Sequence, residues 1–151
     1  MATTEQTLRE DLQAALRSRD EVRLSTLRML LAAVQREQVA GDVARRLDDD
    51  ELQAVLRREA KKRREAATAF EDAGRPDRAE RERAELAVVE GYLPAQLDDD
   101  ELTALVAAAI ADTGAEGPRA MGQVMKAVTA SVAGRADGRR ISAEVRRQLA
   151  G

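Results

Sequence analysis

The stretch PRAMGQVMKAVTASVAGRADGRRISAEVRRQL, Pro118 to Leu149, joins two amphipathic helical patterns through a short basic turn. In the first pattern the large apolar residues recur at the spacing of one helical face, and they are Met121, Val124, Met125, Val128 and Val132. Gly117 and Pro118 mark the start of this helix, and Gly134 marks its end. Because a stripe of this kind must be buried, the stretch predicts packing against other helices.

The second pattern places Ile141, Val145 and Leu149 on one face, and it predicts a final helix that opens at Ile141-Ser142 with Ser142 as its N-cap. The turn before it, GRADGRR, is bounded by Gly134 and Gly138, which permit backbone angles that other residues avoid. Three arginines are expected to project from this turn: Arg135, Arg139 and Arg140. An arginine fork can bind a phosphate bidentately, and free N–H groups at a helix start add positive partial charge. The turn is therefore a candidate anion site, or alternatively a solvated charged turn.

The segments MGQVMKA, GRADG and VRRQL together resemble the terminal motif of the GatB/YqeY family, and ELAVVEGYLPAQL, residues 85–97, is similar to a segment of free-standing YqeY proteins. Many YqeY-type sequences have a basic residue after the first motif glycine, whereas this chain has Gln123, like the amidotransferase tail, which argues against a phosphate contact at this position. The motif positions that carry the resemblance are Tyr92, Leu93, Pro94, Met121, Gly122, Val124, Met125, Gly134 and Gly138.

The resemblance implies an all-α fold that ends in a small three-helix domain of GatB/YqeY type. In the wider family this motif forms the tail of the GatB component of the glutamine-dependent aspartyl/glutamyl-tRNA amidotransferase, where it is associated with holding tRNA. It therefore implies tRNA, or an amidotransferase or other translation-related protein, as a partner. Combined with the charge of the turn, it gives a candidate RNA-binding set: Lys126, Arg135, Arg139 and Arg140.

The composition of the 151 residues favours helix, because alanine and charged residues dominate and there is one Phe, one Tyr and no Trp. Charge is uneven along the chain. Residues 115–151 hold seven Lys and Arg against three Asp and Glu, whereas the preceding residues hold 18 against 25. Only the C-terminal part is thus a plausible nucleic-acid surface. No apolar run reaches the roughly 20 residues of a membrane span and no signal peptide is evident, so we expect a cytoplasmic protein without membrane contact.

The chain lacks the commonest general base and the commonest activated nucleophile, since it has no His and no Cys. No serine-nucleophile, phosphate-loop or dinucleotide motif is present, so we expect no intrinsic catalysis and no cofactor. Any carbon-nitrogen ligase role would be that of an associated component. The repeated LDDDEL, at residues 47–52 and 97–102, lacks the spacing of a calcium loop. Asp48 with Glu51, and Asp98 with Glu101, instead predict capping boxes, and no metal is expected.

Periodicity divides the remainder into helices with short turns between them. The first is capped by Thr3 or Thr4 and carries Leu8, Leu12 and Leu16; the second runs from Asp20 to about residue 41. A helix over 49–72 and another after Pro76, with an Asp77–Glu80 capping pair, form a long antiparallel hairpin. We therefore predict about seven helices, with an N-terminal helical domain over residues 1–93 and a C-terminal domain over 94–151.

Two further features leave alternatives open. The long hairpin carries a dense basic run, Arg57 to Arg64. It is either an RNA-binding surface or, as we expect, a solvated face that nearby acidic residues such as Glu59 and Glu65 neutralise. Tyr92 either stacks on a base or packs between the two parts of the chain. The leading hypothesis is a non-catalytic binding module that contacts tRNA through its C-terminal domain. The alternative is a scaffold protein that docks a partner through the long hairpin without binding RNA.

Overall fold

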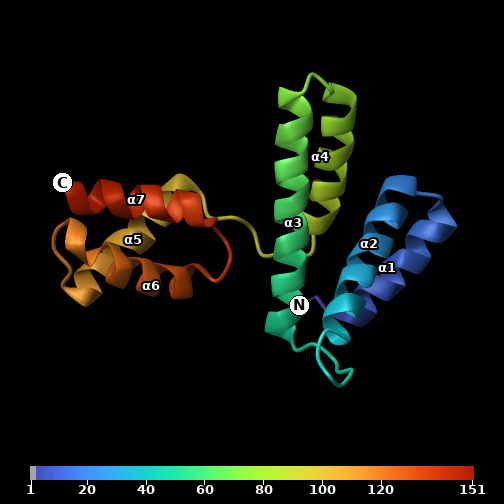
Figure 1. Ribbon diagram of the computed structural model, residues 1–151, viewed down its shortest axis with the longest axis horizontal. Coiled ribbons are helices and arrows are strands. Elements are labelled where there is room, and N and C mark those ends of the chain that lie inside the picture. Colours follow the sequence, from blue (N-terminus) through green and yellow to red (C-terminus); the bar gives the residue numbers. More distant parts are fainter. Residues whose placement is uncertain (1–2) are drawn as a thin grey trace. The chain divides into compact units, whose positions relative to one another are not determined.

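The computed structural model describes residues 3–151 and contains seven α-helices and one short 3-10 helix (Figure 1). No β-strand occurs within those residues, which confirms the all-α prediction. The chain divides into two compact units, the first ending at Pro94 and the second comprising Ala95–Gly151. Each unit has a hydrophobic core of its own.

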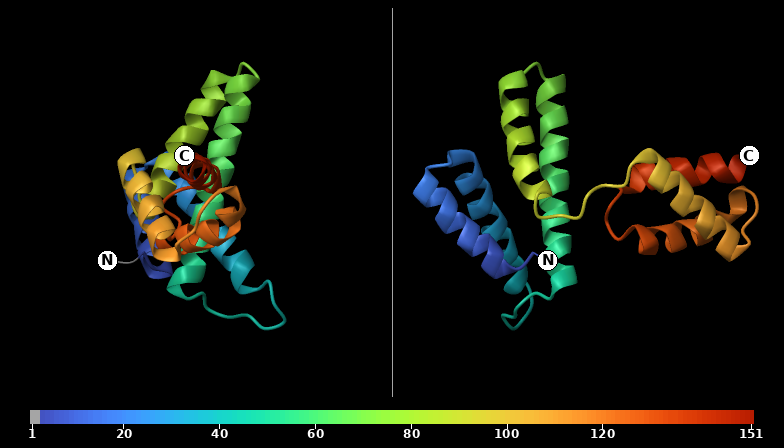
Figure 2. Two further views of the ribbon diagram at one scale, coloured as in Figure 1. Left: turned by 90° about the vertical axis from the view of Figure 1, so that its left-hand side faces the viewer. Right: turned by 180° about the vertical axis from the view of Figure 1, so that it is seen from behind.

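Two helical hairpins build the N-terminal unit. The shorter one pairs α1 (Glu5–Ser18) with α2 (Glu21–Gln38), and the longer one pairs α3 (Asp49–Asp72) with α4 (Pro76–Glu90) (Figures 1 and 2). Helix α2 packs against both α3 and α4, so the hairpins share one core. Its large, fully buried side chains are Leu8, Leu27, Leu30, Val34, Val55, Leu56 and Val89.

Four helix starts agree with the sequence, because the predicted side chains cap them. Thr4 Oγ1 accepts from the N–H of Thr7 at 3.1 Å, and Asp20 Oδ1 accepts from the N–H of Arg23 at 3.1 Å. Both LDDDEL copies form the capping boxes that the sequence predicts, at the starts of α3 and α5. Each such cap stabilises its helix by about 1 kcal/mol.

Three local predictions are wrong. Helix α4 starts at Pro76, so the expected Asp77–Glu80 pair lies inside the helix, and it has no side-chain cap, because its N-cap residue is Arg75, whose side chain has no acceptor. Helix α2 ends at Gln38 rather than near residue 41. Leu16 is 50% exposed, because it lies in the last turn of α1 beside the hairpin turn.

The basic run of α3 separates into one buried and several exposed cations. The exposed ones are neutralised as predicted, with pairs such as Arg58 to Glu37 at 2.8 Å, Lys61 to Glu65 at 3.9 Å, Lys62 to Glu59 at 3.1 Å and Arg64 to Glu90 at 3.5 Å. Arg63 departs from the prediction of a solvated face. It is only 6% exposed, and its Nη1 donates to Glu59 Oε2 at 2.8 Å.

Tyr92 is half-buried against the core of the N-terminal unit. Its hydroxyl donates to Asp11 Oδ2 and accepts from Arg23 Nη2 at 2.9 Å. The Arg23 guanidinium lies 5.7 Å from the centre of the ring. Burial, followed by the hydrogen bond to Asp11, raises the pKa of Tyr92 well above its ordinary value. The polar contacts of its hydroxyl therefore tie the end of this unit back to α1 and α2.

The C-terminal unit contains α5 (Asp99–Thr113), η1 (Pro118–Ala120), α6 (Met121–Val132) and α7 (Gly138–Ala150). The three α-helices pack pairwise around one core (Figure 1). The apolar stripe of α6 is buried as predicted, and its core partners include Leu102, Val106, Ile141 and Val145. None of the helices in residues 3–151 is long and apolar enough to cross a membrane.

Candidate nucleic-acid interface

The turn between α6 and α7 reverses the chain through two left-handed residues. Ala133 has φ 49° and Gly134 has φ 81°, so Gly134 does supply the conformation that the sequence predicts. Gly138 does not. It is the first residue of α7, its φ is not positive, and a Cβ placed there would meet nothing within 4 Å. The conformational need for glycine thus exists at only one end of the turn.

These two glycines give a matched pair of substitutions. Gly138→Ala is expected to stabilise the C-terminal unit by about 0.4–1 kcal/mol, because it restricts the unfolded chain at a position that an alanine fits. Gly134→Ala is expected to destabilise it by about 1–2 kcal/mol, the cost of the left-handed conformation for a residue with a Cβ. Thermal unfolding followed by circular dichroism measures both. Equal effects of the two substitutions would contradict the assignment.

Helix α7 begins three residues earlier than predicted. Its N-cap is Asp137, whose Oδ1 accepts from the N–H of Arg140 at 2.9 Å, so the prediction of Ser142 as N-cap is wrong. Aspartate caps a helix at least as well as serine, and the earlier cap lengthens the helix. Arg139 and Arg140 consequently belong to the first turn of α7. The backbone N–H of Arg140, at the helix start that the sequence predicted to be free to bind an anion, is therefore already bonded to Asp137.

Two of the three arginines hold the turn against the segment before α5. Arg135 Nε donates to the carbonyl of Ala95 at 2.8 Å, and Arg140 Nη2 donates to the carbonyl of Leu97 at 2.8 Å. The N–H of Leu97 completes the link by donating to the carbonyl of Arg135 at 2.7 Å. Both arginines are half-buried rather than projecting freely, and Arg140 also lies 3.2 Å from Asp99. Their position is set by contacts with residues that lie about 40 positions earlier in the sequence.

Arg139 and Lys126 are the exposed members of the candidate set, and neither makes an ion pair in the described part of the chain. Sequence reasoning missed Arg146, which is also exposed and without an ion pair among those residues. Arg146 lies seven residues after Arg139, which is two helical turns, so both lie on one face of α7. That spacing is visible in the sequence and could have identified it.

A neighbouring arginine of α7 is already neutralised. Arg147 Nη2 donates to Glu144 Oε1 at 2.5 Å, and Gln148 donates to the same oxygen at 2.7 Å. The hydrogen bond from Arg147, followed by that from Gln148, lowers the pKa of Glu144 to about 2. Glu144 therefore stays ionised in mild acid. The uncompensated positive charge of α7 lies instead on the face that carries Arg139 and Arg146.

These observations define an all-α protein with two helical units, whose second unit carries its basic residues on α6 and α7 and in the turn between them. A sequence model described as Yqey-like protein matches residues 5–149. The chain belongs to the YqeY family, as the resemblance in residues 85–97 and 118–149 indicated.

One relative supports this assignment. Altered inheritance of mitochondria protein 41, mitochondrial, from Pyrenophora tritici-repentis (strain Pt-1C-BFP), is 32% identical to this chain over 133 residues. The match covers 85% of this chain and 71% of the relative. The relative is mitochondrial by name, so a cytoplasmic location of the present protein stays a prediction.

Proposed function

We propose that this protein is a non-catalytic module that binds tRNA through its C-terminal unit. The observation that carries the proposal is a set of exposed cations on α6 and α7 without an ion pair among the described residues, Lys126, Arg139 and Arg146. They lie within residues 115–151, which hold seven basic and three acidic residues. Guanidinium and ammonium groups of this kind bind phosphate oxygens. Its place of action would be beside an amidotransferase or another translation-related protein.

The proposed mode of recognition is by shape and phosphate rather than by base. The two aromatic residues of the chain, Phe70 and Tyr92, both precede residue 95, so the C-terminal unit has no ring on which a base can stack. Folded RNA offers phosphates and 2′-hydroxyls at defined spacings, and this suits cations held on rigid helices.

Arg135 and Arg140 have a second role in this proposal. Each uses one nitrogen to hold a backbone carbonyl, and a guanidinium has five N–H donors, so further donors remain for a phosphate. Their fixed orientation lowers the entropy cost of that contact. The same bonds make them poor test positions, because their replacement would also loosen the turn.

The test is a native gel shift of the full chain with bulk tRNA at low and at physiological salt. Replacing Lys126, Arg139 and Arg146 together by alanine should weaken binding at every salt concentration while leaving helicity unchanged. Each lost phosphate contact should also flatten the log-log dependence of binding on salt by about one unit.

The matched control removes three charges from α3 by replacing half-buried Arg57 and exposed Arg58 and Lys61 with alanine. Nearby carboxylates neutralise two of these, Arg58 and Lys61, so we expect little effect on tRNA binding. A larger loss from the control would place the RNA surface on the long hairpin. Absence of any shift with the unaltered protein would leave the alternative function, in which the long hairpin docks a partner protein.

A further inference from the structure

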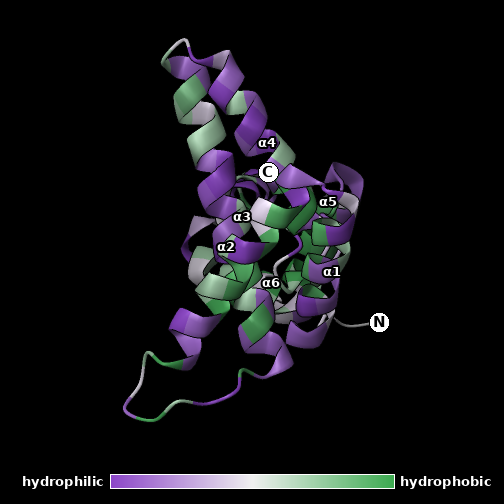
Figure 3. Cartoon of the chain, turned by 90° about the vertical axis from the view of Figure 1, so that its right-hand side faces the viewer, coloured by the Kyte–Doolittle hydropathy of each residue, from purple (hydrophilic) through white to green (hydrophobic). Residues whose placement is uncertain are grey.

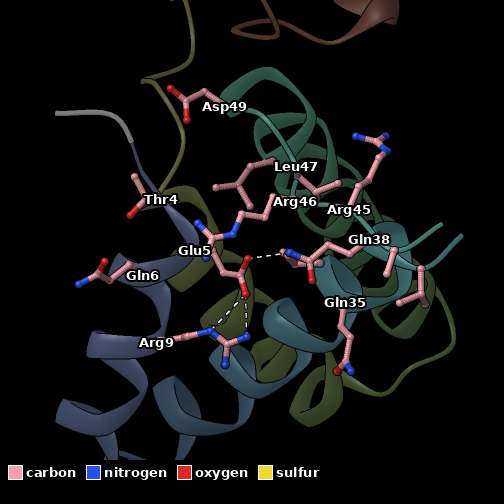
Figure 4. Close-up of a pocket in the computed structure, with 14 residues that line it drawn as sticks. Thr4, Glu5, Gln6, Arg9, Gln35, Gln38, Arg45, Arg46, Leu47 and Asp49 are labelled. Carbon is pink, nitrogen blue, oxygen red and sulfur yellow. Dashed lines mark hydrogen bonds and ion pairs between the residues drawn. The ribbon is translucent and has the colours of Figure 1, made fainter. Parts of the chain in front are cut away.

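A pocket lies in the N-terminal unit, in a part of the chain that the proposed RNA interface does not use. It has a volume of about 950 Å³ and opens between the start of α1, the end of α2 and the segment 39–48 that leads into α3 (Figure 4). The lining residues that bear on its chemistry are Glu5, Arg9, Gln35, Arg45, Arg46 and Leu47. A volume of this size accommodates a ligand or several side chains of a peptide.

The charges of the pocket are almost balanced. Arg9 pairs with Glu5 at 2.6 Å. Arg45 holds Glu51 through two bonds of 2.6 and 2.8 Å. Of the three arginines that line the pocket, only Arg46 makes no ion pair in the part of the chain that the structure describes, although it lies near Glu5 (Figure 4). The hydrogen bond from Arg9 is the main cause of the lowered pKa of Glu5, and the charge of Arg46 adds to it.

The lining contains three arginines and two acidic residues, Glu5 and Asp49, and Glu51 neutralises Arg45 from outside the lining, so the cation left without an ion pair among the described residues is Arg46. A polyphosphate or an RNA backbone would bring several negative charges close to those two carboxylates. A single carboxylate needs only the uncommitted guanidinium of Arg46. The charge balance therefore favours a singly charged acidic group as the occupant.

Apolar side chains complete the pocket. Val34, Leu47 and Leu52 line it from the core side. Val39 lines it as well and is 56% exposed, and Val43, in the same segment, is 76% exposed. In Figure 3 the loop between α2 and α3 alternates between hydrophilic and hydrophobic colours. Exposed valines beside an apolar wall are suited to contact with a large apolar side chain of a partner.

The polar groups around this wall are suited to a peptide backbone. Between residues 41 and 47, the structure gives a single backbone hydrogen bond, from the N–H of Arg45 to the carbonyl of Gln38 at 3.0 Å. Gln35 lines the pocket with its side-chain amide unbonded within the described residues. An extended segment of another chain could pair with these free donors and acceptors.

We propose that this pocket binds an extended segment of a partner protein in which one acidic residue adjoins a large apolar residue. The carboxylate pairs with Arg46, the apolar side chain packs on Leu47 beside Val39, and the peptide backbone bonds to the segment 39–48. This activity is separate from RNA binding, because it uses the other unit of the chain and a site with one free cation among the described residues.

The experiment selects phage-displayed random peptides on the full-length protein and measures the affinity of the selected peptides by fluorescence anisotropy. We expect the selected peptides to share an acidic residue next to Leu, Ile, Val or Phe. Arg46→Ala should weaken their binding at least tenfold, the effect of losing one charge-assisted pair of about 1.4 kcal/mol. The control, Arg17→Ala, removes an exposed arginine of α1 outside the pocket and should leave affinity unchanged.

Four results would overturn the proposal. These are a selection that yields no binding peptide, selected peptides without an acidic residue, equal affinity of the Arg46→Ala and unaltered proteins, and displacement of the peptide by bulk tRNA. The last result would make the pocket part of an RNA surface. If replacing Lys126, Arg139 and Arg146 left tRNA binding unchanged, only the proposal for the C-terminal unit would fail. The two proposals can therefore fail independently.

Discussion

Replacing Arg63 by methionine is expected to destabilise the N-terminal unit by about 3 kcal/mol, because it leaves two buried carboxylates without their shared cation. Glu59 and Glu85 are 6% and 7% exposed, and Arg63 lies 2.8 Å from an oxygen of the first and 3.7 Å from an oxygen of the second. Exposed Lys62 and Arg81 still contact these carboxylates, which keeps the cost at the lower end of the range for broken buried pairs.

Tyr92 provides the measurement, since it is the single tyrosine of a chain without tryptophan and lies in the N-terminal unit. Urea unfolding followed by tyrosine fluorescence should show the lower midpoint for Arg63→Met. Lys62→Met, whose side chain is 65% exposed, should change stability by less than about 0.5 kcal/mol. A combined variant with Arg63→Met, Glu59→Gln and Glu85→Gln should recover part of the loss. Equal effects of the two single substitutions would show that the buried network contributes nothing specific.

The burial of Arg63 could have been predicted from the sequence, although a charged residue within a basic run is normally expected to be exposed. Glu59 and Arg63 lie on the same helical stripe as Leu52, Leu56 and Ala67, at spacings of three, four and seven residues. A basic run is usually a solvated face. The prediction followed that general rule and not the helical periodicity, which indicates burial. A charged residue in register with an apolar stripe, with an opposite charge four residues away, indicates a buried ion pair.

The two capping boxes were predictable because they are local. Asp48 and Glu51, like Asp98 and Glu101, contain in a few residues all the groups that the capping boxes use. The roles of Arg135 and Arg140 could not be predicted from the sequence, because their partners are the backbone carbonyls of Ala95 and Leu97. A backbone carbonyl has no signature in the sequence, and only the fold brings it to the turn.

The pocket of the N-terminal unit could not be predicted from the sequence either. The ends of α1 and α2 meet there with a connection that has no regular structure, and no periodicity reports such a meeting. Arg45 and Arg46 are adjacent in sequence, yet one is bound by Glu51 and the other has no ion pair among the described residues. The candidate interface of the C-terminal unit, in contrast, was partly predictable, because charge segregation and helical spacing are properties of the sequence.

Val128→Asp is expected to unfold the C-terminal unit while leaving the N-terminal unit folded. Val128 is fully buried, and its core belongs to residues 95–151. Burying an unpaired carboxylate costs several kcal/mol at least. At about 0.05–0.15 kcal/mol per residue, a unit of this size has a stability of only about 3–8 kcal/mol, so one such substitution consumes most or all of it.

The two units can be followed separately in the full chain. Circular dichroism should lose the helical signal of α5, α6 and α7, whereas the urea midpoint from Tyr92 fluorescence should stay that of the unaltered protein, since no aromatic residue follows position 92. Thr129→Asp, at the next position of α6 and exposed, should leave both signals unchanged. Loss of the Tyr92 transition together with the C-terminal helices would mean that the chain folds as a single cooperative domain. Independent behaviour would allow the C-terminal unit to be produced alone, and the tRNA gel shift could then be repeated on residues 95–151 by themselves.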